Sequence, residues 1–444
     1  MTKNPVLTVA LAVLTAALGL IYLAAVPAAL ATPAEDALAQ GSTLLRQRKF
    51  AAALAAFDKS ISLDPQSAKA LTNRGIAHDR LRHYRKAVDD YTAAIKLQPT
   101  LTRVYVCRSL AYLQLAQYQK TVDDTTKAIS LDPKRAEAYN NRAVADLKLG
   151  QYQKCIEDST QALKLKPELI KAYANRGAAN GLLGHYELAI EDCNKAIAAN
   201  PRLVYAYIQR GAAFFKAGQN QKAIDDFTKA IVLKPKSWST YLRRGAAYAV
   251  AGEFQKEIDD SNKALTLAPK STGAYANRAA ANVQLGNYKS AIDDSTKAIA
   301  LAPNLQSAYL IRAAANGAVG QPQKQIDDAS KVITLDARSA RAYANRAAAY
   351  AQLGQYQKAI DDSTRAIALD PKFVPAYVSR GAASVGLKHY QSAIQDLSKA
   401  ISFNPRNGEA YYWRSKADEK MGKHVLAESD RNKAEKLNYR IEQK

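Results

Sequence analysis

Prolines recur along this chain at a fixed interval of 34 residues, and the register never slips. The series is Pro65, Pro99, Pro133, Pro167, Pro201, Pro235, Pro269, Pro303, Pro371 and Pro405, with Ala337 in the one interrupted position. Self-similarity at such a period is typical of proteins whose units stack, because no unit can bury its apolar face alone. The interval therefore predicts twelve tandem repeats over residues 34–441 of the 444.

Each repeat covers 34 residues, and we number the places within a repeat from one. The predicted repeats are 34–67, 68–101, 102–135, 136–169, 170–203, 204–237, 238–271, 272–305, 306–339, 340–373, 374–407 and 408–441. With 48% hydrophobic residues, the chain can bury a large core.

Apolar residues recur within each repeat at helical spacing, as the tenth repeat illustrates. Tyr343, Ala347 and Tyr350 form a stripe at i, i+4 and i+7, Gly354 marks a turn, and a second apolar stripe ends at Leu369. The proline that follows cannot continue a helix. Each repeat is thus predicted to be a hairpin of two helices. Small residues at place eight should let the two helices approach closely.

The segment AYANRAAAYAQLGQYQKAIDDSTRAIALDPKF resembles the tetratricopeptide repeat, and the resemblance covers 408 residues. It implies an all-α fold, an α-α superhelix, in which hairpins stack into a right-handed solenoid. It also implies a concave face, lined mainly by first helices, that binds peptide segments of protein partners. The resemblance implies no catalysis, so the chain is predicted not to be an enzyme.

The few cysteines and histidines give no sign of a metal site or a cofactor. Three cysteines and five scattered histidines provide neither a disulfide framework nor zinc-ligand spacing. Cys155 and Cys193 occupy core places and are interpreted as buried thiols, with a bridge between them left open in an oxidising compartment. Cys107 takes the sixth place of the third repeat, and a reactive role for it is the weaker alternative.

Residues 1–31 differ from everything that follows them and are predicted to be an export signal. Lys3 is followed by an uncharged stretch from Val6 to Ala25, and small residues at Ala29 and Ala31 resemble a cleavage site. Cleavage after Ala31 would place the protein in the periplasm or release it. The alternative is an uncleaved anchor through Val6 to Ala25, because about twenty apolar residues can span a bilayer.

The net charge of +23 is spread along the chain, which favours a solvated basic surface over a nucleic-acid stripe. Export weakens a nucleic-acid function further. The densest basic patch consists of Arg80, Arg82, Arg85 and Lys86. An anionic membrane or cell-envelope polymer is its predicted alternative partner.

Arginine at place seven and aspartate at place twenty-three occur together in eleven of the twelve repeats. The first repeat lacks both, having Gln40 and Ala56. In a hairpin that turns near place fifteen, both places lie eight residues from the turn and hence at the same height. We predict a salt bridge between the two helices of each repeat, and a binding role for these arginines remains the alternative.

The concave face should be lined by places two, five, six, nine, twelve and thirteen of the first helices. Place six carries a recurring asparagine, which can both donate to and accept from the backbone of an extended peptide. The ladder consists of Asn73, Asn141, Asn175, Asn277 and Asn345. It resembles the asparagine ladder of peptide-binding family members, and the competing interpretation is that asparagine is only the family's common residue there. Places five and nine are mostly small or apolar between residues 170 and 390, which suits apolar contacts with a partner.

Three functions follow from these features. The leading hypothesis is an exported, non-catalytic scaffold that binds partner peptide segments in its concave groove. The alternatives are a basic module that binds anionic lipid or polysaccharide, and a substrate-presenting subunit of an envelope enzyme complex. No repeat has the lysine and asparagine of the carboxylate clamp at places five and nine, which disfavours recognition of acidic C-terminal tails by that mechanism. The sequence names neither the partner nor an oligomeric state.

Overall fold

The structure, a computed structural model, describes residues 31–437 and 439. The predicted export segment, apart from Ala31, and residue 441 at the end of the last repeat lie outside the described residues. Helices joined by short turns make up the described part of the chain, and no strand occurs there. None of these helices is both long enough and apolar enough to span a membrane.

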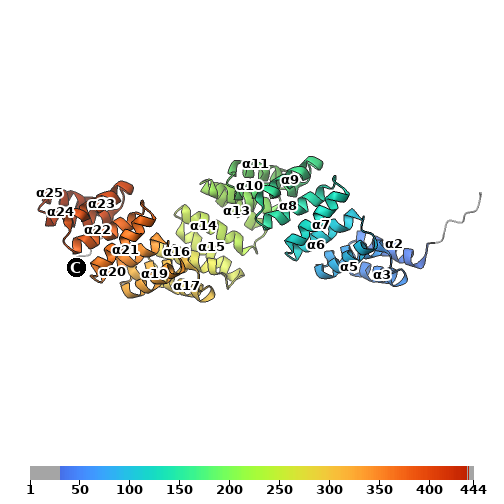
Figure 1. Ribbon diagram of the computed structural model, residues 1–444, viewed down its shortest axis with the longest axis horizontal. Helices are drawn as coiled ribbons and strands as arrows, with labels where there is room; N and C mark the ends of the chain where they lie inside the picture. The colour runs from blue at the N-terminus through green and yellow to red at the C-terminus, as the bar shows by residue number, and fades with distance from the viewer. Residues whose placement is uncertain (1–30, 438, 440–444) are drawn as a thin grey trace, which may run out of the picture. The chain divides into compact units, whose positions relative to one another are not determined.

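The chain divides into two compact units, residues 1–201 and 202–444 (Figure 1). The helices of the first unit are α2 (Pro33–Arg46), α3 (Phe50–Leu63), α4 (Ala68–Arg80), α5 (Tyr84–Leu97), α6 (Thr102–Gln114), α7 (Tyr118–Leu131), α8 (Ala136–Lys148), α9 (Tyr152–Leu165), α10 (Ile170–Leu182) and α11 (Tyr186–Ala199).

The second compact unit continues the same pattern of paired helices. They are α12 (Val204–Lys216), α13 (Asn220–Leu233), α14 (Trp238–Val250), α15 (Phe254–Leu267), α16 (Thr272–Gln284), α17 (Tyr288–Leu301), α18 (Gln306–Ala318), α19 (Pro322–Leu335), α20 (Ala340–Gln352), α21 (Tyr356–Leu369), α22 (Val374–Gly386), α23 (Tyr390–Phe403), α24 (Gly408–Lys420) and α25 (His424–Lys436). Two helices fall within each predicted repeat, which confirms the all-α solenoid of hairpins.

Local sequence signals set the ends of these helices. Ser339 caps α20 by accepting a hydrogen bond from the backbone of Ala342. At the other end of this hairpin, α21 stops at Leu369, two residues before Pro371. Asp370, the residue before this proline, has an extended backbone (φ −138°, ψ 96°), because proline disfavours the helical conformation in its predecessor.

Place fifteen, between the helices of each hairpin, adopts the left-handed conformation in every repeat. Glycine occupies it in eight repeats, as Gly354 does with φ of 71°. Four repeats hold a residue with a side chain in this conformation, at Arg48, Arg82, Ala116 and Lys388. The turn geometry is therefore imposed by the packing of the two helices and does not depend on glycine alone.

Close packing inside a hairpin depends on the small residue at place eight, as predicted. A Cβ atom added to Gly381 would lie 2.6 Å from Cγ of Leu397 at place twenty-four. Gly75 stands in the same relation to Tyr91, where the distance to Cε1 would again be 2.6 Å. A glycine in the first helix thus accommodates a large side chain of the second.

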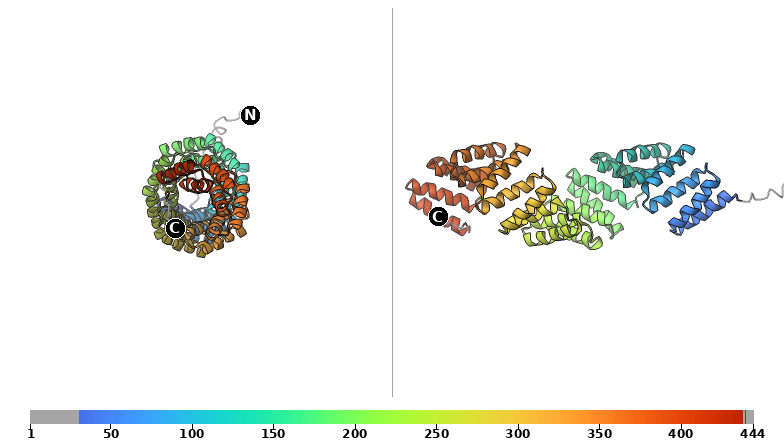
Figure 2. Two further views of the ribbon diagram at one scale, coloured as in Figure 1. Left: turned by 90° about the vertical axis from the view of Figure 1, so that its left-hand side faces the viewer. Right: turned by 90° about the horizontal axis from the view of Figure 1, so that it is seen from below.

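Within each compact unit the first helices of successive hairpins contact one another, as α20, α22 and α24 do, and Figure 2 shows the paired helices following a curved path. No second helix contacts the second helix of a neighbouring hairpin in the described part of the chain. Within each compact unit the first helices therefore form the inner layer of the curve. Their exposed side is the surface on which the resemblance places peptide binding.

Candidate functional site

The arginine at place seven supports this inner layer, and all eleven predicted pairs with aspartate are formed. In the tenth repeat, Nε and Nη2 of Arg346 donate to Oδ2 and Oδ1 of Asp362 at 2.7 and 3.0 Å. The two side chains are only 21% and 10% exposed. A two-pronged contact at this burial fixes the register of one helix against the other.

The same guanidinium also reaches the preceding repeat, which the sequence analysis did not predict. Nη1 of Arg346 donates to Oγ of Ser330 on α19 at 3.1 Å. Counting Arg346, ten place-seven arginines donate in this way to the side chain at place twenty-five of the preceding repeat. The acceptors are Asp58, Thr92, Thr126, Thr160, Thr228, Asn262, Thr296, Ser330, Thr364 and Ser398. The oxygen-bearing side chain that recurs at place twenty-five is the sequence feature from which these bonds could have been predicted.

These contacts occupy the arginines within the framework. The hydrogen bond with Asp362 raises the pKa of Arg346, although burial opposes that shift. All three guanidinium nitrogens of Arg346 donate to protein oxygens, so the framework holds this side chain in place. The geometry therefore supports the structural interpretation of the ladder of pairs.

The predicted asparagine ladder falls into two groups. The side-chain amides of Asn73, Asn141 and Asn175 donate to Ser42, Ser109 and Asn140 of the preceding first helix, at 3.3, 3.1 and 3.1 Å. Asn141 and Asn175 are also buried, at 9% and 6% exposed.

Asn277 and Asn345 are half-buried, and no side-chain hydrogen bond ties either of them to the described residues. Only these two keep their amides available to a ligand. A peptide-binding role for the ladder stays a prediction.

The small residues at places five and nine contribute less open surface than predicted. Ala174, Ala344 and Val378 at place five are 1%, 3% and 3% exposed, and Ala178 at place nine is 4% exposed. They pack between neighbouring first helices, whose close contact covers them. Other members of these places remain partly accessible, and Leu242, Ala348 and Ala382 line two hollows in the second compact unit.

The first hollow, of about 390 Å³, lies across α20, α22 and α24. Ala348, Ala382 and Val385 form part of its lining. Tyr356 lies against Gly386, where an added Cβ would lie 2.5 Å from Cζ of the ring. The ring therefore forms a wall that a side chain at position 386 would displace.

Trp413 and Glu409 of α24 complete this hollow. Desolvation by the surrounding residues raises the pKa of Glu409, although the residue is exposed at the surface, and a hydrogen bond with Trp413 opposes the rise. The carboxyl group is the one acidic function in a lining that is mostly apolar and aromatic but also includes Gln352 and Ser379, and a cationic group on a ligand could pair with it.

The second hollow, of about 720 Å³, lies between the starts of α14 and α16. Trp238, Leu242 and Gly273 are part of its lining, and Trp238 is 43% exposed. The chain contains two tryptophans, and each one lines a hollow of the inner layer. Tryptophan at places one and six was the sequence signal for both sites, and the sequence analysis did not use it.

The predicted basic patch lies at the turn between α4 and α5. Arg80, Arg82, Arg85 and Lys86 are all exposed. No ion pair ties any of these four side chains to the described residues. The charges are therefore free to face solvent or an anionic surface.

Two of the three cysteines are core residues, as the leading interpretation held, and Cys107 is partly buried. Cys155 and Cys193 are fully buried. Burial raises the pKa of Cys155 to about 12 and also raises the pKa of Cys107, which disfavours the thiolate and hence a reactive role. The bridge left open between Cys155 and Cys193 is absent, since Cys155 is a free thiol.

Two polar residues replace the small residue at place twenty. Glu257 and Gln325 are buried, at 4% and 5% exposed. Gln325 donates from Nε2 to the backbone carbonyl of Asn345 in the next repeat at 2.9 Å. Both hairpins retain their helices, so neither polar residue prevents formation of the hairpin.

Family models described as tetratricopeptide repeat match seven segments of this chain. The matches are residues 38–101, 125–157, 170–203, 204–237, 272–305, 340–373 and 374–407, the first spanning two predicted repeats. Together they cover more than half of the chain. No curated protein matches the sequence.

Solved structures share the architecture at low sequence identity. The structure titled "Crystal structure of APC/C hetero-tetramer Cut9-Hcn1" is similar with a TM-score of 0.51 and 14% identity, over 90% of this chain and 98% of that chain. Yeast Tom70 gives a TM-score of 0.40 and 17% identity, over 90% and 96%. A tetratricopeptide repeat protein from Parabacteroides merdae gives 0.45 and 20%, over 56% and 99%. The first of these similarities supports the fold alone.

Proposed function

Because this chain belongs to the tetratricopeptide repeat family, we propose that it is a non-catalytic scaffold that holds partner peptide segments on the first helices of residues 202–444. Repeats of this family serve as protein-interaction scaffolds. The observation that carries the proposal is the position of the two tryptophans, each in a hollow of the inner layer.

The chemistry of the hollows defines the peptide. Tryptophan and tyrosine are the side chains that most often dominate binding energy in protein interfaces, because they bury a large area with few rotatable bonds. The lining of the hollow at Trp238 favours an apolar side chain. At Trp413 we expect an apolar residue with a neighbouring basic group that keeps Glu409 ionised.

A peptide library displayed on phage tests this assignment. Peptides selected on the whole protein should bind at least tenfold more weakly to Trp413→Ala or Trp238→Ala, as expected for central aromatic anchors. Phe403→Ala is the matched control, since this aromatic residue ends the second helix α23 outside both hollows. Equal losses with all three variants, or none, would contradict the proposal.

The ladder provides an independent test because its members differ in their contacts. Replacing Asn277 and Asn345 by alanine should weaken peptide binding by roughly 0.5 to 1.5 kcal/mol for each lost hydrogen bond, with unchanged melting. The same change at Asn73 and Asn175 should instead lower the melting temperature, because their amides bond to the preceding repeat. Lower stability without weaker binding at all four positions would assign the whole ladder to the framework.

The place of action is proposed to lie outside the cytosol, on the strength of the export-like residues 1–31. Mass spectrometry of the protein from its native cell distinguishes the two routes. A mature chain that begins at Thr32 supports cleavage, whereas an intact N-terminus in the membrane fraction supports the anchor through Val6 to Ala25. An intact chain in the soluble cytosolic fraction would overturn export.

The exposed basic patch supports a second candidate function, attraction to anionic lipid or polysaccharide. Binding to vesicles that contain phosphatidylglycerol should fall steeply as salt is added, because exposed charges are screened. Arg82→Glu with Arg85→Glu should remove that binding. Lys229→Glu with Lys263→Glu is the control, since both lysines are exposed on second helices away from the patch. Equal effects of the two pairs would indicate net charge alone.

A further inference from the structure

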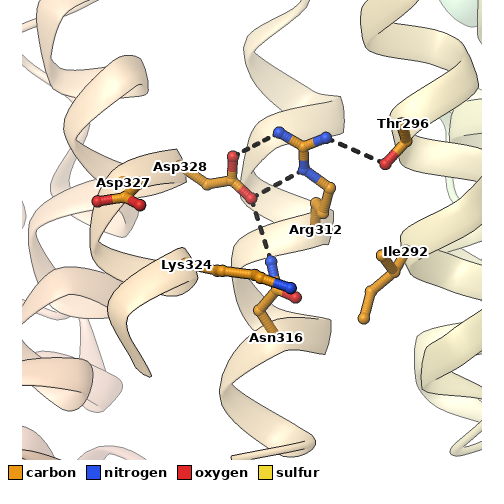
Figure 3. Close-up of a pocket in the computed structure, with 7 residues that line it drawn as sticks. All are labelled: Ile292, Thr296, Arg312, Asn316, Lys324, Asp327 and Asp328. Atoms are coloured by element: carbon orange, nitrogen blue, oxygen red, sulfur yellow. Dashed lines mark hydrogen bonds and ion pairs between the residues drawn. The ribbon is translucent and has the colours of Figure 1, made fainter. Parts of the chain in front are cut away.

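The ninth repeat contains a cavity on the outer side of its hairpin, away from the inner surface proposed above. The cavity of about 330 Å³ lies between α17, α18 and α19. Ile292, Thr296, Arg312, Asn316, Lys324, Asp327 and Asp328 line it (Figure 3). Arg312 keeps its framework contacts, since it donates to Asp328 at 2.7 and 2.9 Å and to Thr296 at 3.0 Å.

Other repeats fill the corresponding space with an aromatic ring of their own. In the tenth repeat the ring of Tyr350, at place eleven, lies close to two cations. Its centroid is 6.0 Å from Cζ of Arg346 and 5.4 Å from Nζ of Lys358. The same arrangement of ring, arginine and lysine recurs at Tyr112, Phe214 and Tyr248. Cations favour the faces of aromatic rings in this way.

The sequence couples the ring to the lysine. Lysine stands at place nineteen in each of those four repeats, whereas repeats five, eight and eleven lack both the ring and the lysine, with Leu188, Ser290 and Ser392 at that place. The fourth repeat matches its lysine with a carboxylate at place eleven, Asp146. The ninth repeat keeps Lys324 but has Asn316 at place eleven, so both cations are present without the ring.

Asn316 places a hydrogen-bond acceptor without a partner in the cavity lining. This side chain is 2% exposed, and its Nδ2 donates to Oδ2 of Asp328 at 3.3 Å. Its Oδ1 is buried with no hydrogen-bond partner among the described residues. In Figure 3, Lys324 reaches from α19 toward Asn316, and its ammonium group makes no ion pair with the described residues. An unpartnered buried acceptor is costly, and a donor that reached it would relieve that cost.

We propose that this cavity receives the phenol ring of a tyrosine from a partner protein. The ring would lie close to Arg312 and Lys324, as Tyr350 lies close to Arg346 and Lys358. A ring that enters edge-first from solvent carries its hydroxyl deepest, where the hydroxyl donates to Oδ1 of Asn316. Tyrosine is preferred to phenylalanine because of that acceptor, and three of the four internal rings are tyrosines.

The first test adds small probes to the whole protein and measures their affinity by ligand-observed NMR and the lysine side-chain signals by protein-observed NMR. N-acetyl-tyrosinamide should bind roughly fivefold more tightly than N-acetyl-phenylalaninamide, since one hydrogen bond separates them. The ε-methylene protons of Lys324 should shift upfield on binding, because they come to lie over the ring. N-acetyl-leucinamide that binds as well as the tyrosine probe, or a Lys324 signal that does not move, would overturn the proposal.

Two reciprocal substitutions make the test specific. Asn316→Tyr should fill the cavity from within and abolish probe binding. Tyr350→Asn should open a second site in the tenth repeat, where Arg346 and Lys358 remain, and so double the binding stoichiometry. Lys324→Ser, which copies the eighth and eleventh repeats, should weaken binding severalfold without affecting folding. Binding that persists in Asn316→Tyr and is unchanged in Lys324→Ser would exclude this site.

Longer probes show whether the bound ring belongs to a partner protein or to a free aromatic molecule. Tyrosine-containing pentapeptides should bind at least tenfold more tightly than N-acetyl-tyrosinamide, because flanking residues add contacts on α17 and α19. If para-cresol and N-acetyl-tyrosinamide bind as tightly as every pentapeptide, the site serves a free aromatic molecule and the assignment to a partner protein is wrong. This proposal does not depend on peptide binding at the two tryptophan hollows. The phage-display experiment can therefore fail while the tyrosine site is confirmed, and the reverse.

Discussion

Repeats nine (306–339) and ten (340–373) are adjacent hairpins with the same backbone and the same arginine–aspartate pair, yet they finish their outer surfaces differently. Tyr350 closes the tenth repeat with a ring close to two cations. Asn316 leaves the ninth open as a cavity. The hairpin is therefore specified by a few shared places, and the remaining places can vary the surface without changing the fold.

The inner sides of the two hairpins differ as well. The tenth repeat has Ala351 and Ala359 at places twelve and twenty, whereas the ninth has Gly317 and Gln325. A Cβ atom added to Gly317 would lie 2.8 Å from Cδ of Gln325, so the glycine accommodates the long side chain. Each pair is matched in volume, as close-packed interiors require.

The largest effect is expected when the arginine–aspartate pair that the two repeats share is broken. Arg346→Met should lower the local free energy of unfolding by about 3 to 5 kcal/mol, because Asp362 remains buried without its partner. Arg312→Met should cost about 1 kcal/mol less, since Asn316 still donates to Asp328. Hydrogen exchange of peptides from α20–α21 and α18–α19 measures both losses separately, which matters because repeat arrays need not unfold in one step.

The control for this prediction removes the stranded charge. Asp362→Leu in the Arg346→Met background should recover most of the loss. Purely additive effects of the two substitutions would show that the pair does not interact.

The next effect extends the comparison to the seventh repeat, which has a ring at Tyr248 but Glu257 at place twenty, where the tenth has alanine. Burial raises the pKa of Glu257 from 4.5 to about 7. The folded protein thus holds this carboxyl neutral over a range in which the unfolded chain ionises it. The contribution of Glu257 to stability should be most favourable below pH 4.5 and should fall as the pH rises from 4.5 to about 7.

Replacement of Glu257 should remove this pH dependence of stability. At pH 8, Glu257→Ala should raise the local free energy of unfolding by roughly 2 to 3 kcal/mol, because about two pKa units of burial cost disappear. Ala359→Glu in the tenth repeat should introduce the same pH dependence there. Hydrogen exchange at pH 5 and pH 8 compares them, and a pH-independent gain from Glu257→Ala would show that packing, not ionisation, is responsible.

Much of the fold could be predicted because the same pattern of residues recurs in every repeat. The salt bridges could be predicted because arginine and aspartate occur together in eleven repeats and are absent together from the first, which has Gln40 and Ala56 in their places. The bonds of Asn141 and Asn175 to the preceding helix could not be predicted, since they depend on the rotation between successive hairpins, which spacing alone does not give. The cavity at Asn316 had a signal in the coupling of places eleven and nineteen, which becomes visible only when repeats are compared with one another.

The smallest effect concerns the matched pair inside the ninth repeat. Gly317→Ala alone should gain little or destabilise, because the new methyl group meets the end of Gln325. In the Gln325→Ala background, the same substitution should raise the local free energy of unfolding by about 0.5 to 1 kcal/mol, since alanine suits a helix interior better than glycine. The double substitution reproduces the pair found in the tenth repeat. A double-mutant cycle followed by hydrogen exchange in α18 and α19 should therefore give a positive coupling. If Gly317→Ala has the same effect with and without Gln325, the two places are not matched, and the contrast between the inner sides of the two repeats has no energetic basis.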